Sequence, residues 1–231
     1  MKTIGLIGGM SWESTVPYYR QINEAVKNRL GGLHSAKIIL FSVDFHGIEE
    51  LQHAGDWDTA GKQLADAATA LERAGAECVV ICTNTMHKVA EQVQAAVSIP
   101  LLHIADPTAA AIKAADRNTV GLLGTRFTME QDFYRARLER DHGLSVLVPE
   151  EQDRVVIHRI IYDELCLGIV KDASREQYVA IIERLVAKGA QAIILGCTEI
   201  SLLVQPGDSS VPLFDTTAIH AAEAARWSME S

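Results

Sequence analysis

Short apolar runs along the chain alternate with segments whose apolar residues recur every three or four positions. The runs are typical of buried strands and the longer spacing is typical of amphipathic helices. The predicted strands lie at 3–8, 37–44, 78–83, 100–104, 119–124, 192–197 and 212–216. The predicted helices lie at 13–29, 46–53, 58–74, 86–96, 106–115, 129–141, 151–167, 174–188 and 217–229. This alternation predicts an α/β fold with parallel sheets flanked by helices.

Two of the strand-like runs recur in the second half of the chain. TIGLIG at 3–8 reads against TVGLLG at 119–124, an offset of 116 residues. GAECVVI at 75–81 reads against GAQAIIL at 189–195, an offset of 114 residues. Buried parallel strands resemble one another in any case, but two matches in the same order with nearly equal offsets favour an internal duplication.

A duplicated α/β unit predicts two similar lobes with a cleft between them. Open α/β sheets bind ligands at the carboxyl ends of their strands. The residues after the repeated strands are therefore expected to line one site. They are 9–11, which include Met10, and 82–85 in the first lobe, and 125–128 and 196–199 in the second.

Composition narrows the choice of partners. The 231 residues are 48% hydrophobic, which is enough for a full core in one large domain or two small ones. The net charge of −9 and the absence of a basic run argue against nucleic acid or an anionic membrane surface as the main partner. A small ligand, anionic or not, stays compatible with this charge.

The cysteines and the start of the chain indicate a cytoplasmic enzyme with free thiols. Cys78, Cys82, Cys166 and Cys197 form no C-x-x-C pair, and the chain is too long for a small disulfide scaffold. The first apolar run is interrupted by glycines and followed by Glu13, so it is too short for a signal peptide or a membrane span.

The repeat predicts different roles for Cys82 and Cys197, the two cysteines at the ends of strands. At the offset of 114, Cys82 falls on Gly196 and Thr83 falls on Cys197. Cys82 therefore takes the place of a glycine, and we expect it to pack as a small apolar residue. Cys197 lies between a strand and an expected helix start, where the helix dipole can lower the pKa of a thiol. The alternative is that Cys197 is a buried, inert side chain.

The turns after the strands also carry oxygen and nitrogen donors. Thr83, Asn84 and Thr85 offer hydroxyl, amide and backbone groups that suit a carboxylate ligand, and Thr198 and Glu199 have the matching role in the second lobe. Capping of a helix start is the alternative role for these residues. The glycines at 8–9 do not form the G-x-G-x-x-G pattern, so a dinucleotide site is disfavoured.

Four motifs together resemble the aspartate/glutamate racemase family. They are GLIGGMSWEST at 5–15, CTNTMH at 82–87, GLLGTRFTM at 121–129 and GCTEI at 196–200. The resemblance covers nearly the whole chain and is closest to the enterobacterial branch of L-aspartate/glutamate-specific or broad-specificity amino-acid racemases.

The resemblance implies a particular architecture and chemistry. It implies a first α/β lobe at 1–104, to which a helix at 216–231 returns, and a second lobe at 105–215, with the active site in the cleft between them. It also implies a homodimer that acts on a small amino-acid substrate without pyridoxal phosphate or a metal. In this family two cysteines face opposite sides of the substrate Cα: one removes the α-proton and the other delivers a proton.

This sequence departs from the family pattern at the first cysteine. Most members read C-N-T where this chain reads Thr83-Asn84-Thr85. The resemblance thus makes Cys197 and Thr83 the catalytic pair, with Asn84, Thr85 and Thr198 in the substrate-binding turns. Because a threonine hydroxyl is a much weaker acid than a thiol, the pair is expected to act unequally on the two enantiomers. The resemblance to the branch that carries this substitution implies a preference for L-substrates.

A second departure concerns the substrate side chain. The family's Tyr-x-x-x-Lys, which helps to hold the distal carboxylate, corresponds to Tyr162 and Cys166. The missing cation makes neutral substrates as compatible as acidic ones. Gln52 lies in the region that contacts the substrate side chain in relatives. The alternative is that Gln52 is an exposed glutamine at the end of a helix. For Tyr162 and Arg126, a place in the site and a place on the surface are equally compatible with the sequence.

Two other functions compete with racemisation. The first is a related reaction of the same superfamily, such as maleate isomerisation or a decarboxylation, which acts on substrates without an α-ammonium group. The second is a racemase-like protein that binds an amino acid but has lost turnover together with its first cysteine. A substrate screen distinguishes the first alternative from racemisation, and a test for turnover distinguishes the second.

Overall fold

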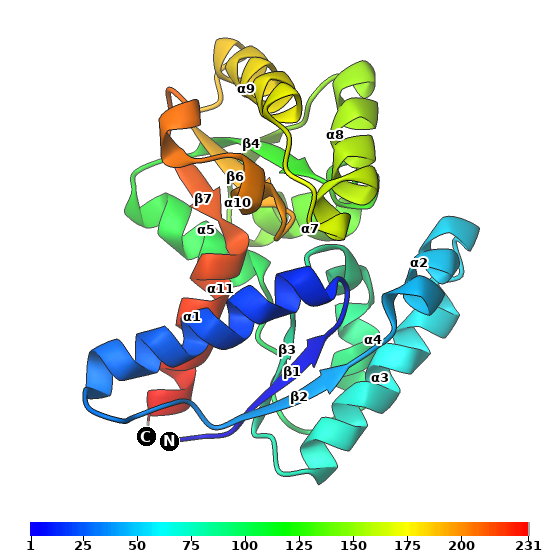
Figure 1. Cartoon of the computed structure of the whole chain (residues 1–231), viewed down its shortest axis with the longest axis vertical. Helices are drawn as coiled ribbons and strands as arrows, with labels where there is room; N and C mark the ends of the chain where they lie inside the picture. Colours follow the sequence, from blue (N-terminus) through cyan, green and yellow to red (C-terminus); the bar gives the residue numbers. More distant parts are fainter. Residues whose placement is uncertain (231) are drawn as a thin grey trace. The chain divides into compact units, whose positions relative to one another are not determined.

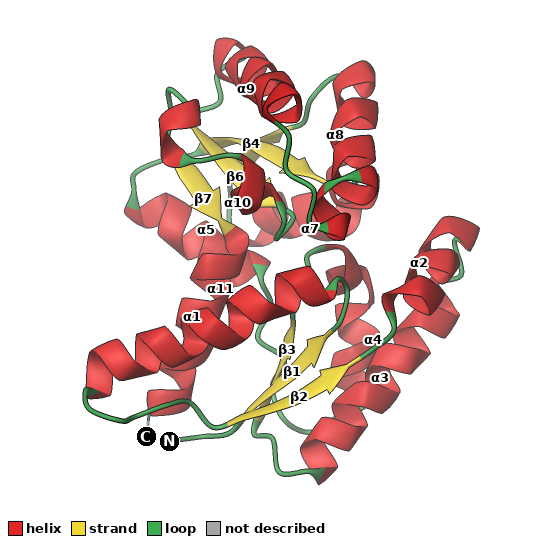
Figure 2. Cartoon of the chain, viewed as in Figure 1, coloured by secondary structure: helices red, strands yellow, loops and turns green. Residues whose placement is uncertain are grey.

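The computed structural model describes residues 1–230 and contains two parallel sheets flanked by helices (Figures 1 and 2). The chain divides into two compact units. The first comprises Met1–Ile104 and the end of the chain from His220 onward, and the second comprises Ala105–Ile219. The predicted α/β fold with parallel sheets is confirmed.

The sheet of the first unit has the order β2-β1-β3, with both pairs parallel. Its strands are β1 (Ile4–Gly8), β2 (Ile38–Ser42) and β3 (Cys78–Ile81). Its helices are α1 (Trp12–Leu30), α2 (Phe45–Ala54), α3 (Trp57–Arg73), the 3-10 helix η1 (Thr85–Val89), α4 (Ala90–Ala95) and most of α11 (Thr216–Met229).

Both faces of β1 and β3 are buried, which explains why these strands lack polar residues. Alternate residues of a strand point to opposite faces. Leu6 and Cys82 pack in the core formed with α1 and α11, whereas Ile7 and Ile81 pack in the core formed with α3. Figure 1 shows α1 and α3 on opposite sides of the sheet.

The sheet of the second unit has the order β5-β4-β6-β7 and is also parallel. Its strands are β4 (Thr119–Gly124), β5 (Ser145–Leu147), β6 (Ala192–Gly196) and β7 (Leu213–Asp215). The remaining elements are α5 (Ala105–Ala114), α6 (Arg126–Glu130), α7 (Asp132–Ala136), the π-helix η2 (Arg137–Asp141), α8 (Glu151–Asp163), η3 (Leu165–Leu167), α9 (Asp172–Ala187), α10 (Ile200–Leu203) and η4 (Pro206–Asp208). Helices α8 and α9 cover one face of this sheet.

The strand registers reproduce the internal repeat. Ile4 pairs with Cys78 in the first sheet, and Val120 pairs with Ala192 in the second. These pairs are related by the offsets of 116 and 114 residues that the sequence predicts. Every following pair of β1 and β3 has its counterpart in β4 and β6. The two units therefore share one topology around their central strands.

The predicted strand at 100–104 is wrong as a strand. Only Leu101 makes a bridge, to Val79, where the second unit has the full strand β7. The main-chain amide of Ile104 instead donates to Nε2 of His87, at 3.2 Å. Because a side chain takes this amide, the segment leaves the sheet after one bridge.

Three predicted helices are shorter or more broken than their patterns suggest. The helix predicted at 129–141 is interrupted by Gln131, whose extended backbone separates α6 from α7, and it ends in a π turn. The helix predicted at 151–167 ends at Asp163, and the one predicted at 86–96 begins as a 3-10 turn.

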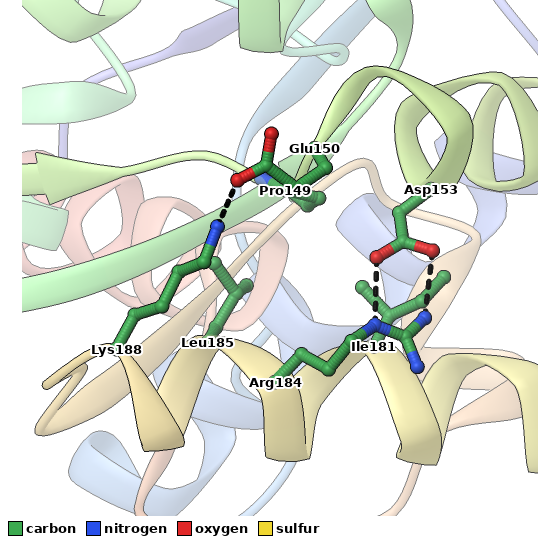
Figure 3. A pocket seen from close by; sticks show the side chains of 7 residues that line it. All are labelled: Pro149, Glu150, Asp153, Ile181, Arg184, Leu185 and Lys188. Atoms are coloured by element: carbon green, nitrogen blue, oxygen red, sulfur yellow. Dashed lines mark hydrogen bonds and ion pairs between the residues drawn. The ribbon is translucent and has the colours of Figure 1, made fainter.

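Charged pairs hold α8 against α9. The Arg184 guanidinium donates to both carboxylate oxygens of Asp153, at 2.8 and 2.6 Å, and Lys188 pairs with Glu150 (Figure 3). A small pocket between these pairs has apolar walls from Pro149, Ile181 and Leu185. It lies at the amino end of α8, whereas Tyr162 and Cys166 lie at and beyond the other end. This pocket belongs to helix packing rather than to the predicted site.

Candidate active site

A glycine directs the chain at the carboxyl end of β1. Gly9 has a φ of +90°, and a Cβ at this position would lie 2.2 Å from the main-chain oxygen of Val43. Only glycine fits both the conformation and the space. It brings Met10, which is buried, to the start of α1, where Ser11 caps the helix by accepting from the amide of Ser14. The backbone of this turn is thus fixed by packing.

The end of β3 separates Cys82 from Thr83. Cys82 is fully buried, and burial raises the pKa of its thiol. The prediction that Cys82 packs as a small apolar residue is confirmed. Thr83, the next residue, is half-buried.

His87 holds the turn that carries Thr83, a role that the sequence analysis missed. Nδ1 of His87 lies 2.8 Å from the main-chain oxygen of Thr83, and Nε2 lies 3.2 Å from the amide nitrogen of Ile104. Because an amide can only donate, Nε2 accepts and the proton of the neutral ring stands on Nδ1. His87 therefore ties the turn after β3 to the segment at Ile104.

The remaining predicted residues of the first unit are all buried. Asn84 and Thr85 begin η1, with exposed fractions of 1% and 5%. Gln52, on α2, is 2% exposed, and its amide donates to the sulfur of Met86 at 3.1 Å. The alternative of an exposed helix-end glutamine is wrong, because α2 turns Gln52 inward onto the apolar core that includes Met86.

The end of β6 brings a thiol and a carboxylate together. The thiol of Cys197 donates to Oε2 of Glu199, with 3.0 Å between Sγ and the oxygen. Cys197 is 9% exposed and Glu199 is 4% exposed. Thr198, between them, is also buried, and its main-chain oxygen accepts from the hydroxyl of Ser201 at 3.0 Å. The turn after β6 is thus as closely packed as the turn after β3.

The predicted lowering of the Cys197 pKa is wrong. Burial raises this pKa well above its ordinary value, and the negative charge of Glu199 raises it further. The helix that follows, α10, has only four residues, so its dipole is too small to compensate. Cys197 therefore carries its proton in the free protein.

Cys166 joins the same cluster. Its thiol donates to the other oxygen of Glu199, Oε1, at 3.7 Å. Tyr162 packs its ring on His158, with 4.6 Å between ring centroids, and Nδ1 of His158 accepts from the amide of Arg126 at 3.3 Å. The second unit therefore brings Cys166, Glu199 and Cys197 together and links Tyr162 to the end of β4. Glu199 was expected in the turn that lines the site, but its hydrogen bonds to the two thiols were not predicted; a carboxylate two residues after a cysteine was the available signal.

Two kinds of feature are absent from the described part of the chain. Within residues 1–230, no group of three or more histidine, cysteine, aspartate or glutamate side chains is placed to hold a metal ion. None of the helices described there combines the length and the apolar character needed to cross a membrane.

Buried thiols predict that the protein loses stability at high pH. Burial raises the pKa of Cys78 from 9.0 to about 12. Above pH 9 the unfolded chain releases this proton while the folded chain keeps it, so Cys78 alone lowers the free energy of unfolding by about 1.4 kcal/mol per pH unit up to pH 12. Urea unfolding from pH 8 to 11 should show a slope steeper than this, because burial also raises the pKa values of Cys82, Cys166 and Cys197. The slope should be shallower in Cys78→Ala, and an identical slope would contradict the assignment.

The chain is similar to known proteins along most of its length. The Asp/Glu/hydantoin racemase family model matches residues 7–224. The broad-specificity amino-acid racemase RacX of Bacillus subtilis is 24% identical over 223 residues, which cover 93% of each chain. A crystal structure of a proposed Asp/Glu racemase from Yersinia pestis is 61% identical over the full length of both chains, with a TM-score of 0.93.

A more distant structure agrees as well. An aspartate racemase homologue from Pyrococcus horikoshii is 37% identical over the full length of both chains, with a TM-score of 0.86. The predicted enzyme class, an isomerase of the racemase type, is confirmed by these matches. The chain belongs to the Asp/Glu/hydantoin racemase family.

Proposed function

We propose that this protein racemises free α-amino acids without pyridoxal phosphate or a metal, and that Cys197 and Thr83 exchange protons with the substrate Cα. The supporting observation is the Glu199 carboxylate 3.0 Å from the Cys197 sulfur. A negative charge beside the reactive thiol favours a substrate that carries a positive charge next to its reacting carbon. The α-ammonium group of an amino acid provides that charge.

The same pair gives a way to form the base only when substrate is bound. In the free protein, burial and Glu199 keep the proton on Cys197. An ammonium group close to Glu199 offsets the carboxylate and makes the thiolate easier to form. The thiol proton passes along its hydrogen bond to Oε2 of Glu199 and from there to solvent, and Cys197 becomes a base beside a bound amino acid.

The proton transfer itself follows from the two groups. The Cys197 thiolate takes the α-proton: the Cα–H bond breaks, an S–H bond forms, and the electron pair moves into the substrate carboxylate. Hydrogen-bond donors of the turns at 83–85 and 198 are expected to stabilise the charge that develops there. The Thr83 hydroxyl then gives its proton to the other face of Cα and regains one from solvent.

The two faces are expected to react unequally. A threonine hydroxyl gives up its proton far less readily than a thiol. The alkoxide that would have to take the α-proton in the reverse direction is therefore hardly populated, and the neutral hydroxyl is a poor base. The two turns also differ in their neighbours, because Cys197 has the Glu199 carboxylate and the Thr83 turn has neutral His87. We expect L-substrates to saturate the enzyme and exchange faster, while the equilibrium constant stays at one.

Two residues, the buried Gln52 and the half-buried Cys166, bear on the substrate side chain. Gln52 offers an uncharged amide, and Cys166 stands where the family has a cation. Neither provides a positive charge for a distal carboxylate. We therefore propose L-aspartate and L-glutamate, or a broader set that includes neutral amino acids, as substrates.

Glu199 also argues against the related reactions that lack an ammonium group. Maleate carries two negative charges and no positive one, so a buried carboxylate at the reacting centre would repel it. A binding protein without turnover could use the carboxylate to hold the ammonium group, but it would need no thiol beside that carboxylate. It predicts tight binding of an amino acid with no exchange at Cα.

The test is exchange of the α-hydrogen in deuterated water across a panel of L- and D-amino acids, acidic and neutral, with maleate as the non-amino substrate. We expect deuterium in at least one amino acid and no isomerisation of maleate. Thr83→Ala should slow exchange of the two enantiomers to different extents. Turnover of maleate, or tight binding of an amino acid without any exchange, would replace the proposed function.

A further inference from the structure

Two thiols share one carboxylate in the second unit. The S–H of Cys197 donates to Oε2 of Glu199 at 3.0 Å, and the S–H of Cys166 donates to Oε1 at 3.7 Å. The three residues come from separate segments, because Cys166 lies in η3 and the other two follow β6. Glu199 and Cys197 are buried and Cys166 is half-buried. This geometry turns Cys166 toward Glu199, although its place in the sequence suggests a contact with the substrate.

We propose that Cys166 is a positioning residue for Cys197: its S–H fixes the Glu199 carboxylate so that Oε2 faces the Cys197 thiol. A glutamate carboxylate rotates easily about its last bond, and a donor on one oxygen restricts this rotation. The donor also draws negative charge toward Oε1 and away from the Cys197 sulfur. For its kinetic consequences this inference rests on the proposed racemisation.

The other ionisable groups near the cluster do not compete with Cys166 for this role. Tyr178, on α9, is fully buried and uncharged, because burial raises its pKa well above the ordinary value. Glu164 is already held by the hydroxyl of Ser174 at 2.6 Å and by Lys171 at 3.2 Å. Burial likewise raises the pKa of Cys166, so this side chain is a neutral donor at physiological pH.

The direction of the effect follows from the charges. Without the S–H donor, more negative charge of Glu199 lies near Cys197, which disfavours the thiolate. Cys166→Val keeps the apolar volume and removes the donor, whereas Cys166→Ser keeps a donor. Compared with the wild type, Cys166→Val should therefore be alkylated at Cys197 with a midpoint at higher pH, and Cys166→Ser should stay close to the wild type.

The experiment measures two quantities on the full chain. The first is the pH dependence of alkylation of Cys197 by iodoacetamide, read from the mass of the peptide that contains Cys197, since three other thiols are present. The second is kcat and KM for the best amino acid of the panel. We expect a kcat about three- to tenfold lower in Cys166→Val, since one hydrogen bond is lost, with KM within about twofold. Cys166→Ser should restore kcat to within about twofold.

Two results would overturn the inference. An unchanged alkylation midpoint in Cys166→Val would mean that Cys166 does not act on Cys197 through Glu199. A change in KM with kcat preserved would mean that Cys166 contacts the substrate. If the wild type racemises nothing, the proposed function fails, but the alkylation midpoint still decides the role of Cys166. If Cys166→Val does not fold, as judged by circular dichroism, Cys166→Ala takes its place in the same measurement.

Discussion

Cys197→Ala is expected to lower kcat/KM by about 10³- to 10⁴-fold for every substrate of the enzyme, because the variant has no group that can take or give the α-proton on that face. The loss should appear in kcat rather than in KM, since the Glu199 carboxylate remains to bind the ammonium group. Chiral chromatography of the products measures both constants.

Cys82→Ala is the matched control for this variant. Cys82 also follows a buried strand, β3, and it is fully buried in the core formed with α1 and α11. Its replacement removes one buried sulfur and should leave kcat/KM within about twofold of the wild type, with a small loss of stability. If Cys82→Ala abolished turnover and Cys197→Ala did not, the roles assigned to the two cysteines would be reversed.

Glu199→Gln is expected to make the Cys197 thiol more acidic and to weaken the binding of substrate. The carboxylate raises the pKa of Cys197, so its removal lowers that pKa. Alkylation of Cys197 at neutral pH should therefore become about tenfold faster for each unit by which the pKa falls. At the same time, the ammonium group loses its partner charge, and KM should rise about tenfold or more.

The exposed Glu183 of α9 provides the control for Glu199→Gln. Glu183→Gln removes the same charge from the same unit and should change neither the alkylation midpoint nor KM. Slower alkylation in Glu199→Gln would contradict the assigned direction of the pKa shift. An unchanged KM would show that Glu199 does not bind the ammonium group.

The buried strands and the register of the two units could be predicted from sequence. Parallel strands buried on both faces are continuous apolar runs, so β1, β3, β4 and β6 stand out, and their offsets carry the repeat. The packing of Cys82 as a small apolar residue followed from the same register. The short elements β5 and α10 could not be predicted, because three or four residues are too few to show a period.

The chemistry of the site was less predictable than its location. The position of Cys197 after a strand suggested a lowered pKa, but the direction depends on burial and on Glu199, which tertiary packing sets. The contact between Cys166 and Glu199 joins segments 33 residues apart, and nothing in the local pattern indicates it. The inward turn of Gln52 and the tie between His87 and Ile104 likewise depend on how distant segments meet.

The most direct test of the account is the incorporation of solvent deuterium at Cα, measured by mass spectrometry for both enantiomers of the best substrate, with the wild type and Cys197→Ala side by side. We predict incorporation with the wild type, faster from the L-enantiomer, and none above the enzyme-free rate with Cys197→Ala. Incorporation by Cys197→Ala at the wild-type rate would show that Cys197 does not transfer the proton.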